Sequence, residues 1–116
     1  MKESDRPYWV ALAHFRAFGP VRMKKLMATF PQMEDVFHAR VDDLFKAGIE
    51  TTLAQRFAQE RIHLDPEGLM RDLEIAGVSA VTIVEDRYPS LLKEIYDPPA
   101  VLFIRGTLPQ SPYWLA

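Results

Sequence analysis

Apolar residues recur at helical spacing through the first two-thirds of the chain and predict six short helices. Prolines and glycines separate them: Gly19-Pro20 ends the first helix and opens the second, and Gly48 closes the fourth. Asp5 and Asp65 are suited to cap the first and sixth helices. The predicted helices occupy residues 7–18, 20–30, 33–37, 42–47, 52–58 and 66–76.

Beyond Gly77 the pattern changes from helical to strand-like. Residues 78–84 are short and β-branched, which predicts a strand, and residues 100–104 are a continuous apolar run, as expected for a strand covered on both faces. Between them, Pro89 can open a brief helix, and the prolines of 97–99 break the chain again. Residues 113–116 form another strand-like run.

This order of elements predicts an α+β chain with two parts. Residues 1–77 form an all-helical domain, and residues 78–116 are the first strands of an α/β domain. A natural terminus seldom falls at the opening of a buried strand. We therefore expect the chain to be a fragment, cut where the second domain starts.

Composition excludes several classes of protein. Of 116 residues, 48% are hydrophobic and 26% charged, as in ordinary globular proteins, and the absence of cysteine excludes disulfides and thiol catalysis. No apolar run is long enough to span a bilayer, and no secretory signal follows the first charges. The expected location is the cytoplasm, with no membrane partner.

Charge is distributed unevenly along the chain. Residues 1–40 hold seven basic and four acidic side chains, a net charge of +3, whereas residues 41–116 hold seven and twelve, a net charge of −5. Because nucleic acid is gripped by displacing counterions with basic groups, contacts with phosphate are expected from the first forty residues.

Two glycine turns, 18–20 and 47–49, each join a helix to a following helix, as in tandem helix–hairpin–helix and related SAM-like domains. In one interpretation the first turn binds a DNA phosphate, and its candidate residues are Gly19, Arg22, Lys24 and Lys25. In the other, both glycines are helix C-caps in a packing module. Pro20 removes one amide from the first turn and Glu50 follows the second, which favours the packing interpretation.

The sequence offers no catalytic constellation. His14, His38 and His63 are isolated, so no metal site is expected. No phosphate-binding loop, dinucleotide motif or nucleophile elbow occurs. We expect no cofactor and a protein that is not an enzyme.

Residues 81–106 resemble the entry signature of the DNA-processing protein A family, also called Smf. The matching features are a strand, an acidic turn, a short helix between two proline motifs, and an apolar strand. The residues that carry the motif are Tyr88, Pro89, Asp97, Pro98, Pro99, Arg105 and Gly106. With the helical part, which is similar to that family's SAM-like domain, the resemblance covers about residues 8–108.

This resemblance implies a non-enzymatic protein of natural transformation and recombination, with a Rossmann-like core that forms dimers. Such a protein binds single-stranded DNA and helps to load the RecA recombinase. The family's main DNA-binding motif would follow the end of this chain. Arg105, at a strand end, can reach a phosphate or pair with an acid, and we expect the ion pair.

Two other functions stay open. The acidic balance after residue 40 suits a protein–protein interaction module that docks a regulator or the recombinase without touching DNA. A nucleotide-handling enzyme would need a glycine-rich loop, and none follows Val84.

Overall fold

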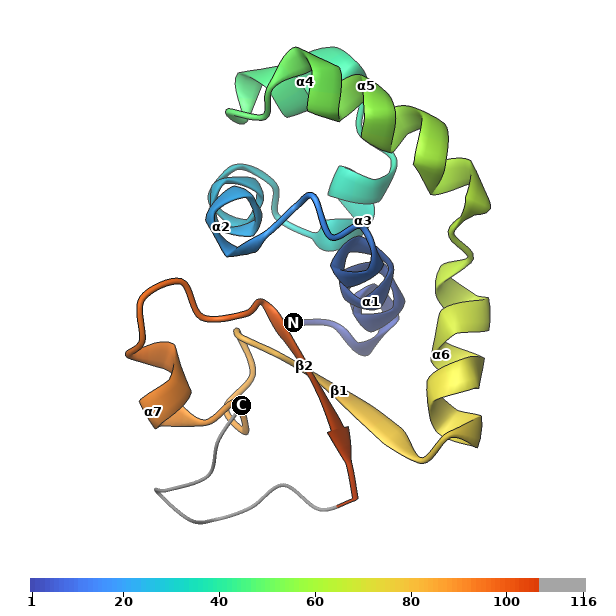
Figure 1. Ribbon diagram of the computed structural model, residues 1–116, viewed down its shortest axis with the longest axis vertical. Coiled ribbons are helices and arrows are strands. Elements are labelled where there is room, and N and C mark those ends of the chain that lie inside the picture. Colours follow the sequence, from blue (N-terminus) through green and yellow to red (C-terminus); the bar gives the residue numbers. More distant parts are fainter. Residues whose placement is uncertain (107–116) are drawn as a thin grey trace.

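The computed structural model describes residues 1–106, which form seven α-helices and two strands (Figure 1). Short 3-10 turns precede the first helix and follow the fifth. The elements are α1 (Arg6–His14), α2 (Pro20–Thr29), α3 (Met33–Phe37), α4 (Val41–Lys46), α5 (Thr51–Glu60), α6 (Pro66–Ile75), β1 (Val78–Thr82), α7 (Ser90–Lys93) and β2 (Val101–Arg105). The α+β character and the order of elements expected from the sequence are thus confirmed, while residues 113–116 lie outside the described residues.

Strands β1 and β2 pair antiparallel, from Val78 opposite Arg105 to Thr82 opposite Val101. We call this pair of strands the hairpin, although the segment that connects them contains α7. One face of the hairpin joins the core of the helices through Ala80 and Val101. The other face packs Leu102 and its neighbours against the segment that contains α7. Figure 1 shows the hairpin below α1, with α7 beside it. The prediction that the run 100–104 is covered on both faces is therefore confirmed for Val101 and Leu102 and is wrong for Phe103, which is exposed.

Aromatic rings hold the link between α1 and α2 against α5. Phe15 follows α1, and its ring centroid lies 4.7 Å from that of Phe18 and 5.1 Å from that of Phe57 in α5. Tilted and edge-to-face arrangements at these separations add stability beyond the area they bury. The three rings are at most 4% exposed, so they anchor the end of α1 immediately before α2 begins.

Asp5 caps a helix, but not the helix predicted for it. Its carboxylate accepts hydrogen bonds from the backbone N–H groups of Met33 (2.9 Å) and Glu34 (2.8 Å), which open α3. It also accepts the indole N–H of Trp9 at 3.0 Å. The expectation that Asp5 caps α1 is wrong because its backbone is helical (φ −87°, ψ −18°), whereas a capping residue needs extended angles.

A buried arginine joins the first helix to the hairpin. Arg6 is only 7% exposed, and its guanidinium donates to both carboxylate oxygens of Glu85, at 2.7 and 2.8 Å. It also donates to Glu3 at 2.6 and 3.0 Å and to the carbonyl oxygen of Ala80 in β1. Glu85 in turn accepts the backbone N–H of Thr82 at 2.6 Å. The division into domains at residue 78 stays a prediction, and across it the described residues share this network and one hydrophobic core.

The network keeps Glu85 ionised. Burial by itself would raise the pKa of the Glu85 carboxyl, but the hydrogen bonds from Arg6 and from the Thr82 amide, with the charge of Arg6, lower it to about 2. Hydrogen bonds to the carboxylates of Glu3 and Glu85 raise the pKa of Arg6 above its ordinary value. Both charges are therefore present throughout the neutral range.

We expect the ionisation of Glu85 to make unfolding sensitive to acid. A carboxyl whose pKa falls on folding, here from 4.5 to about 2, contributes stability that is present above 4.5 and is lost as the pH falls towards 2. This group accounts for a decrease of about 3 kcal/mol in the free energy of unfolding over that range. Urea unfolding followed by circular dichroism at several pH values measures the decrease.

The matched variants are Glu85→Gln and Glu94→Gln, since Glu94 is exposed and outside the network. Glu85→Gln should cost about 3 kcal/mol at pH 7, because the buried Arg6 loses the carboxylate of Glu85 and keeps only the exposed Glu3 as an ionic partner, and should flatten the profile below pH 4.5. Glu94→Gln should change neither the free energy of unfolding at pH 7 nor its decrease below pH 4.5. An unaltered acid profile in Glu85→Gln would show that the network does not secure the hairpin.

Candidate nucleic-acid interface

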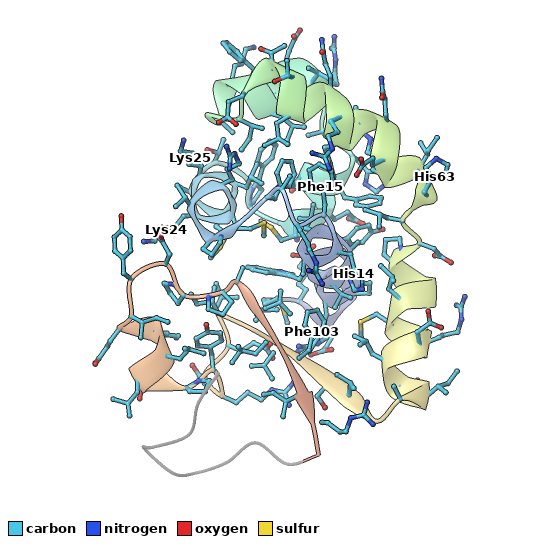
Figure 2. The ribbon with its side chains drawn as sticks, in the orientation of Figure 1. His14, Phe15, Lys24, Lys25, His63 and Phe103 are labelled. Carbon is cyan, nitrogen blue, oxygen red and sulfur yellow. The ribbon has the colours of Figure 1, made fainter. Side chains whose placement is uncertain are left out.

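Helix α2 carries most of the residues predicted to contact DNA. Gly19 is its N-cap and Pro20 its first residue, and Met23 and Leu26 bury one side of the helix in the core. Lys24 and Lys25 are exposed, and Figure 2 shows Lys25 on the side of α2 that faces α4, with Lys24 on another side of the helix. The amphipathic pattern thus presents the two lysines to solvent.

The two glycine turns differ in backbone conformation. Gly48 has φ +101°, and the N–H groups of Gly48 and Ile49 donate back to α4 at 3.0 and 3.1 Å, as in a helix C-cap. Gly19 has φ −65° and ψ −175°, so the expectation that it is a C-cap is wrong. Pro20 explains the difference, because a residue before proline is driven to extended angles.

The two turns lie side by side, and the second neutralises part of the first. Arg22 donates two hydrogen bonds to one carboxylate oxygen of Glu50, at 2.7 and 3.0 Å. The hydrogen bond from Arg22 lowers the pKa of Glu50. Lys25 lays its aliphatic stem against Gly48 and its ammonium lies 3.4 Å from the Gly48 carbonyl oxygen. Of the three basic residues, Lys24 is the one without such a contact among residues 1–106.

Arg105 does not join this group. It ends β2, opposite Val78, and Figure 1 shows that end of the strand pointing away from α2. Among the described residues no acidic side chain lies within ion-pair distance of Arg105, so the predicted ion pair is not formed there. The candidate residues therefore separate into a cluster on α2 and an isolated arginine.

The motif of residues 88–106 supports the hairpin. Tyr88 is 2% exposed, and its hydroxyl donates to the carbonyl oxygen of Pro99 at 2.7 Å, which ties the two ends of the α7 excursion together. Pro89 is the N-cap of α7. Asp97 and Gly106 take positive φ values of 54° and 84° at the turns. These contacts fix the entry of the chain into β2.

A groove that sequence reasoning missed lies next to the start of α2. It has a volume of about 220 Å³ between the end of α1, the first turn of α2 and the start of β2. Its lining residues are Ala13, Arg16, Phe18, Gly19, Pro20, Met23, Pro99, Ala100, Val101 and Phe103. No local pattern in the sequence reveals it, because residues 13–23 and 99–103 meet only in the fold.

A second groove, of about 480 Å³, lies between the N-terminus, the end of α2 and the start of α3. Three methionines contribute to it with Trp9 and Phe30; they are Met1, Met27 and Met33. Methionine side chains adapt their shape to a partner, so surfaces rich in them suit protein ligands.

Comparison with known proteins finds one relevant similarity. The chain is 29% identical over 109 residues to Protein Smf of Synechocystis sp., a match that covers 93% of this chain. The chain spans only 27% of the length of that relative. No family model and no solved structure matches the chain. The resemblance to the Smf family, inferred from residues 81–106, is confirmed by this similarity.

Within residues 1–106, no helix has the length and apolar character to cross a membrane. Over the same range, no three His, Asp or Glu side chains gather in a way that would hold a metal ion.

Substitution of the two glycines should separate their roles. In Gly48→Ala the new Cβ would lie 3.2 Å from Cδ of Lys25 on a backbone with φ +101°, so we expect a loss of about 1 kcal/mol or more in the free energy of unfolding. Gly19→Ala is the matched control, because its Cβ meets nothing within 4 Å and its φ is ordinary. Urea unfolding measures both, and equal losses would contradict the assignment of different turn types.

Proposed function

We propose that this chain is the part of an Smf-like DNA-processing protein that meets single-stranded DNA through the outer face of α2. The observation that carries the DNA-processing role is the similarity to Protein Smf over 109 residues. The exposed Lys24 and Lys25, which lie within the net-positive segment 1–40, support α2 as the contact. Lysine and arginine side chains bind phosphates by releasing counterions, which gives an affinity that falls with salt.

The contact proposed for α2 is weak because neighbouring groups already engage two of its three basic residues. Arg22 is engaged by Glu50, and a phosphate that approaches Arg22 must compete with that carboxylate. Lys25 is partly held by Gly48. Binding through α2 alone is therefore auxiliary, and Lys24 supplies its most available charge.

The wider role follows the same proposal. The helices are proposed to form a SAM-like domain and the hairpin to begin a Rossmann-like one. We propose that the larger protein binds single-stranded DNA mainly through other residues, loads the RecA recombinase and forms dimers. Arg105 is proposed to lie near the DNA that this larger protein binds. No catalytic role is proposed for the described residues.

One observation favours a second function. The methionine-lined groove of about 480 Å³ offers an adaptable surface whose lining includes none of Arg22, Lys24 and Lys25. A helix of a regulator or of the recombinase that placed its apolar side there would make this chain a protein–protein interaction module.

Removal of the Glu50 charge tests the α2 contact. Glu50→Gln frees Arg22 and should raise the affinity of the 116-residue chain for a single-stranded oligonucleotide severalfold at low salt. Lys24→Gln should lower the affinity and reduce its dependence on salt. Fluorescence anisotropy with a labelled oligo-dT measures both.

Glu60→Gln is the matched control, because Glu60 pairs with Arg56 in α5 and the substitution changes the net charge equally. If Glu60→Gln raised the affinity as much as Glu50→Gln, the effect would be one of overall charge and the α2 contact would be wrong. If no oligonucleotide bound at any salt concentration, the interaction module would be the better account.

A further inference from the structure

Phe103 is unusually exposed for the middle of a strand. Its side chain is 44% accessible, although the residue lies between the buried Leu102 and the half-buried Ile104. The ring meets that of His14 in α1 edge-on, with centroids 6.0 Å apart and planes at 80°. Figure 2 shows the two side chains together where β2 passes α1. Phe103 is thus held in place by α1 and the strand while part of its surface stays open.

That open surface lines the groove at the start of α2. The other walls are mostly apolar and rigid, because they come from prolines and backbone at Pro20, Pro99 and Gly19. Arg16 is the one charged residue among the described lining residues, and no acidic side chain of residues 1–106 pairs with it. The groove therefore combines an aromatic side chain, flat apolar walls and a free cation.

This combination is the one that proteins use to bind single strands. A base stacks on an aromatic ring whatever its identity, and an adjacent arginine attracts the phosphate that follows. A volume of about 220 Å³ is smaller than the pockets of about 300–1,000 Å³ that hold whole drug-sized ligands. It suits one unstacked base, and a duplex keeps its bases paired and inaccessible.

We infer that the groove between α1, α2 and β2 binds one nucleobase of single-stranded DNA, with the base against Phe103 and its phosphate at Arg16. The inference rests on the proposed function and gives α2 a second contact. Gly19 and Pro20 belong both to the groove and to the opening of α2, so a strand that leaves the groove along α2 passes next to Lys24.

The test compares two labelled oligonucleotides of equal length, oligo-dT and an abasic phosphodiester, by fluorescence anisotropy with the 116-residue chain. Phe103→Leu keeps an apolar side chain but removes the ring. It should weaken binding of oligo-dT by about tenfold and leave binding of the abasic strand unchanged. Arg16→Gln should weaken both oligonucleotides by similar factors.

Tyr96→Leu is the matched control, because Tyr96 is 92% exposed and does not line the groove, and it should alter neither affinity. If Phe103→Leu bound oligo-dT as the unmodified chain does while Glu50→Gln still raised the affinity, the groove would be overturned and the α2 contact would stand. If neither oligonucleotide bound, both the proposed groove and the proposed α2 contact would be overturned.

A second measurement does not depend on the folding of a variant. Ultraviolet irradiation of the unmodified chain with oligo-dT should crosslink the strand to the peptide that contains residues 99–103, as read by mass spectrometry. Crosslinks confined to other peptides would contradict the proposed groove.

Discussion

The arrangement of the described residues depends on the buried ion pair between Arg6 and Glu85. These residues are 79 positions apart, and their paired hydrogen bonds of 2.7 and 2.8 Å join the first turn of α1 to the turn that follows β1. A buried charge without a partner is strongly destabilising, so each residue constrains the position of the other. The further bonds from Arg6 to Glu3 and to the Ala80 carbonyl oxygen satisfy the rest of the guanidinium.

Fixing the hairpin on α1 also builds the surface proposed to meet DNA. The pairing of β1 with β2 carries Phe103 to the side of His14, and the aromatic cluster of Phe15, Phe18 and Phe57 sets where α1 gives way to α2. The groove at the start of α2 exists because these two constraints meet. Glu50 pairs with Arg22, one of the cations nearby, so the contact proposed with a DNA strand is a weak one.

The local signals in the sequence predicted the elements well, because prolines and glycines act through their own backbone. Pro20 and Pro66 each lie at the first position of a helix, and Gly48 takes the left-handed conformation expected at a helix end. Gly19 was expected to do the same, but the proline that follows it imposes extended angles. The wrong predictions about which side chains contact one another have another cause.

Contacts between distant segments were beyond local patterns. Asp5 reads as a cap for the helix beside it and instead caps α3, about a quarter of the chain away. Nothing adjacent to Arg6 or Glu85 indicates that they pair, and Arg22 reads as a free cation until the fold brings Glu50 to it. Of the candidate site, the sequence therefore identified the basic residues of α2 but neither their neutralisation nor the groove beside them.

The most direct test of the proposed DNA contact is a nuclear magnetic resonance titration of the isotope-labelled chain with a short oligo-dT. If the strand binds the groove and α2, the amide shifts should be confined to residues 13–25 and 99–103. Shifts confined to the methionine-lined groove, or none at a saturating concentration of oligonucleotide, would contradict it.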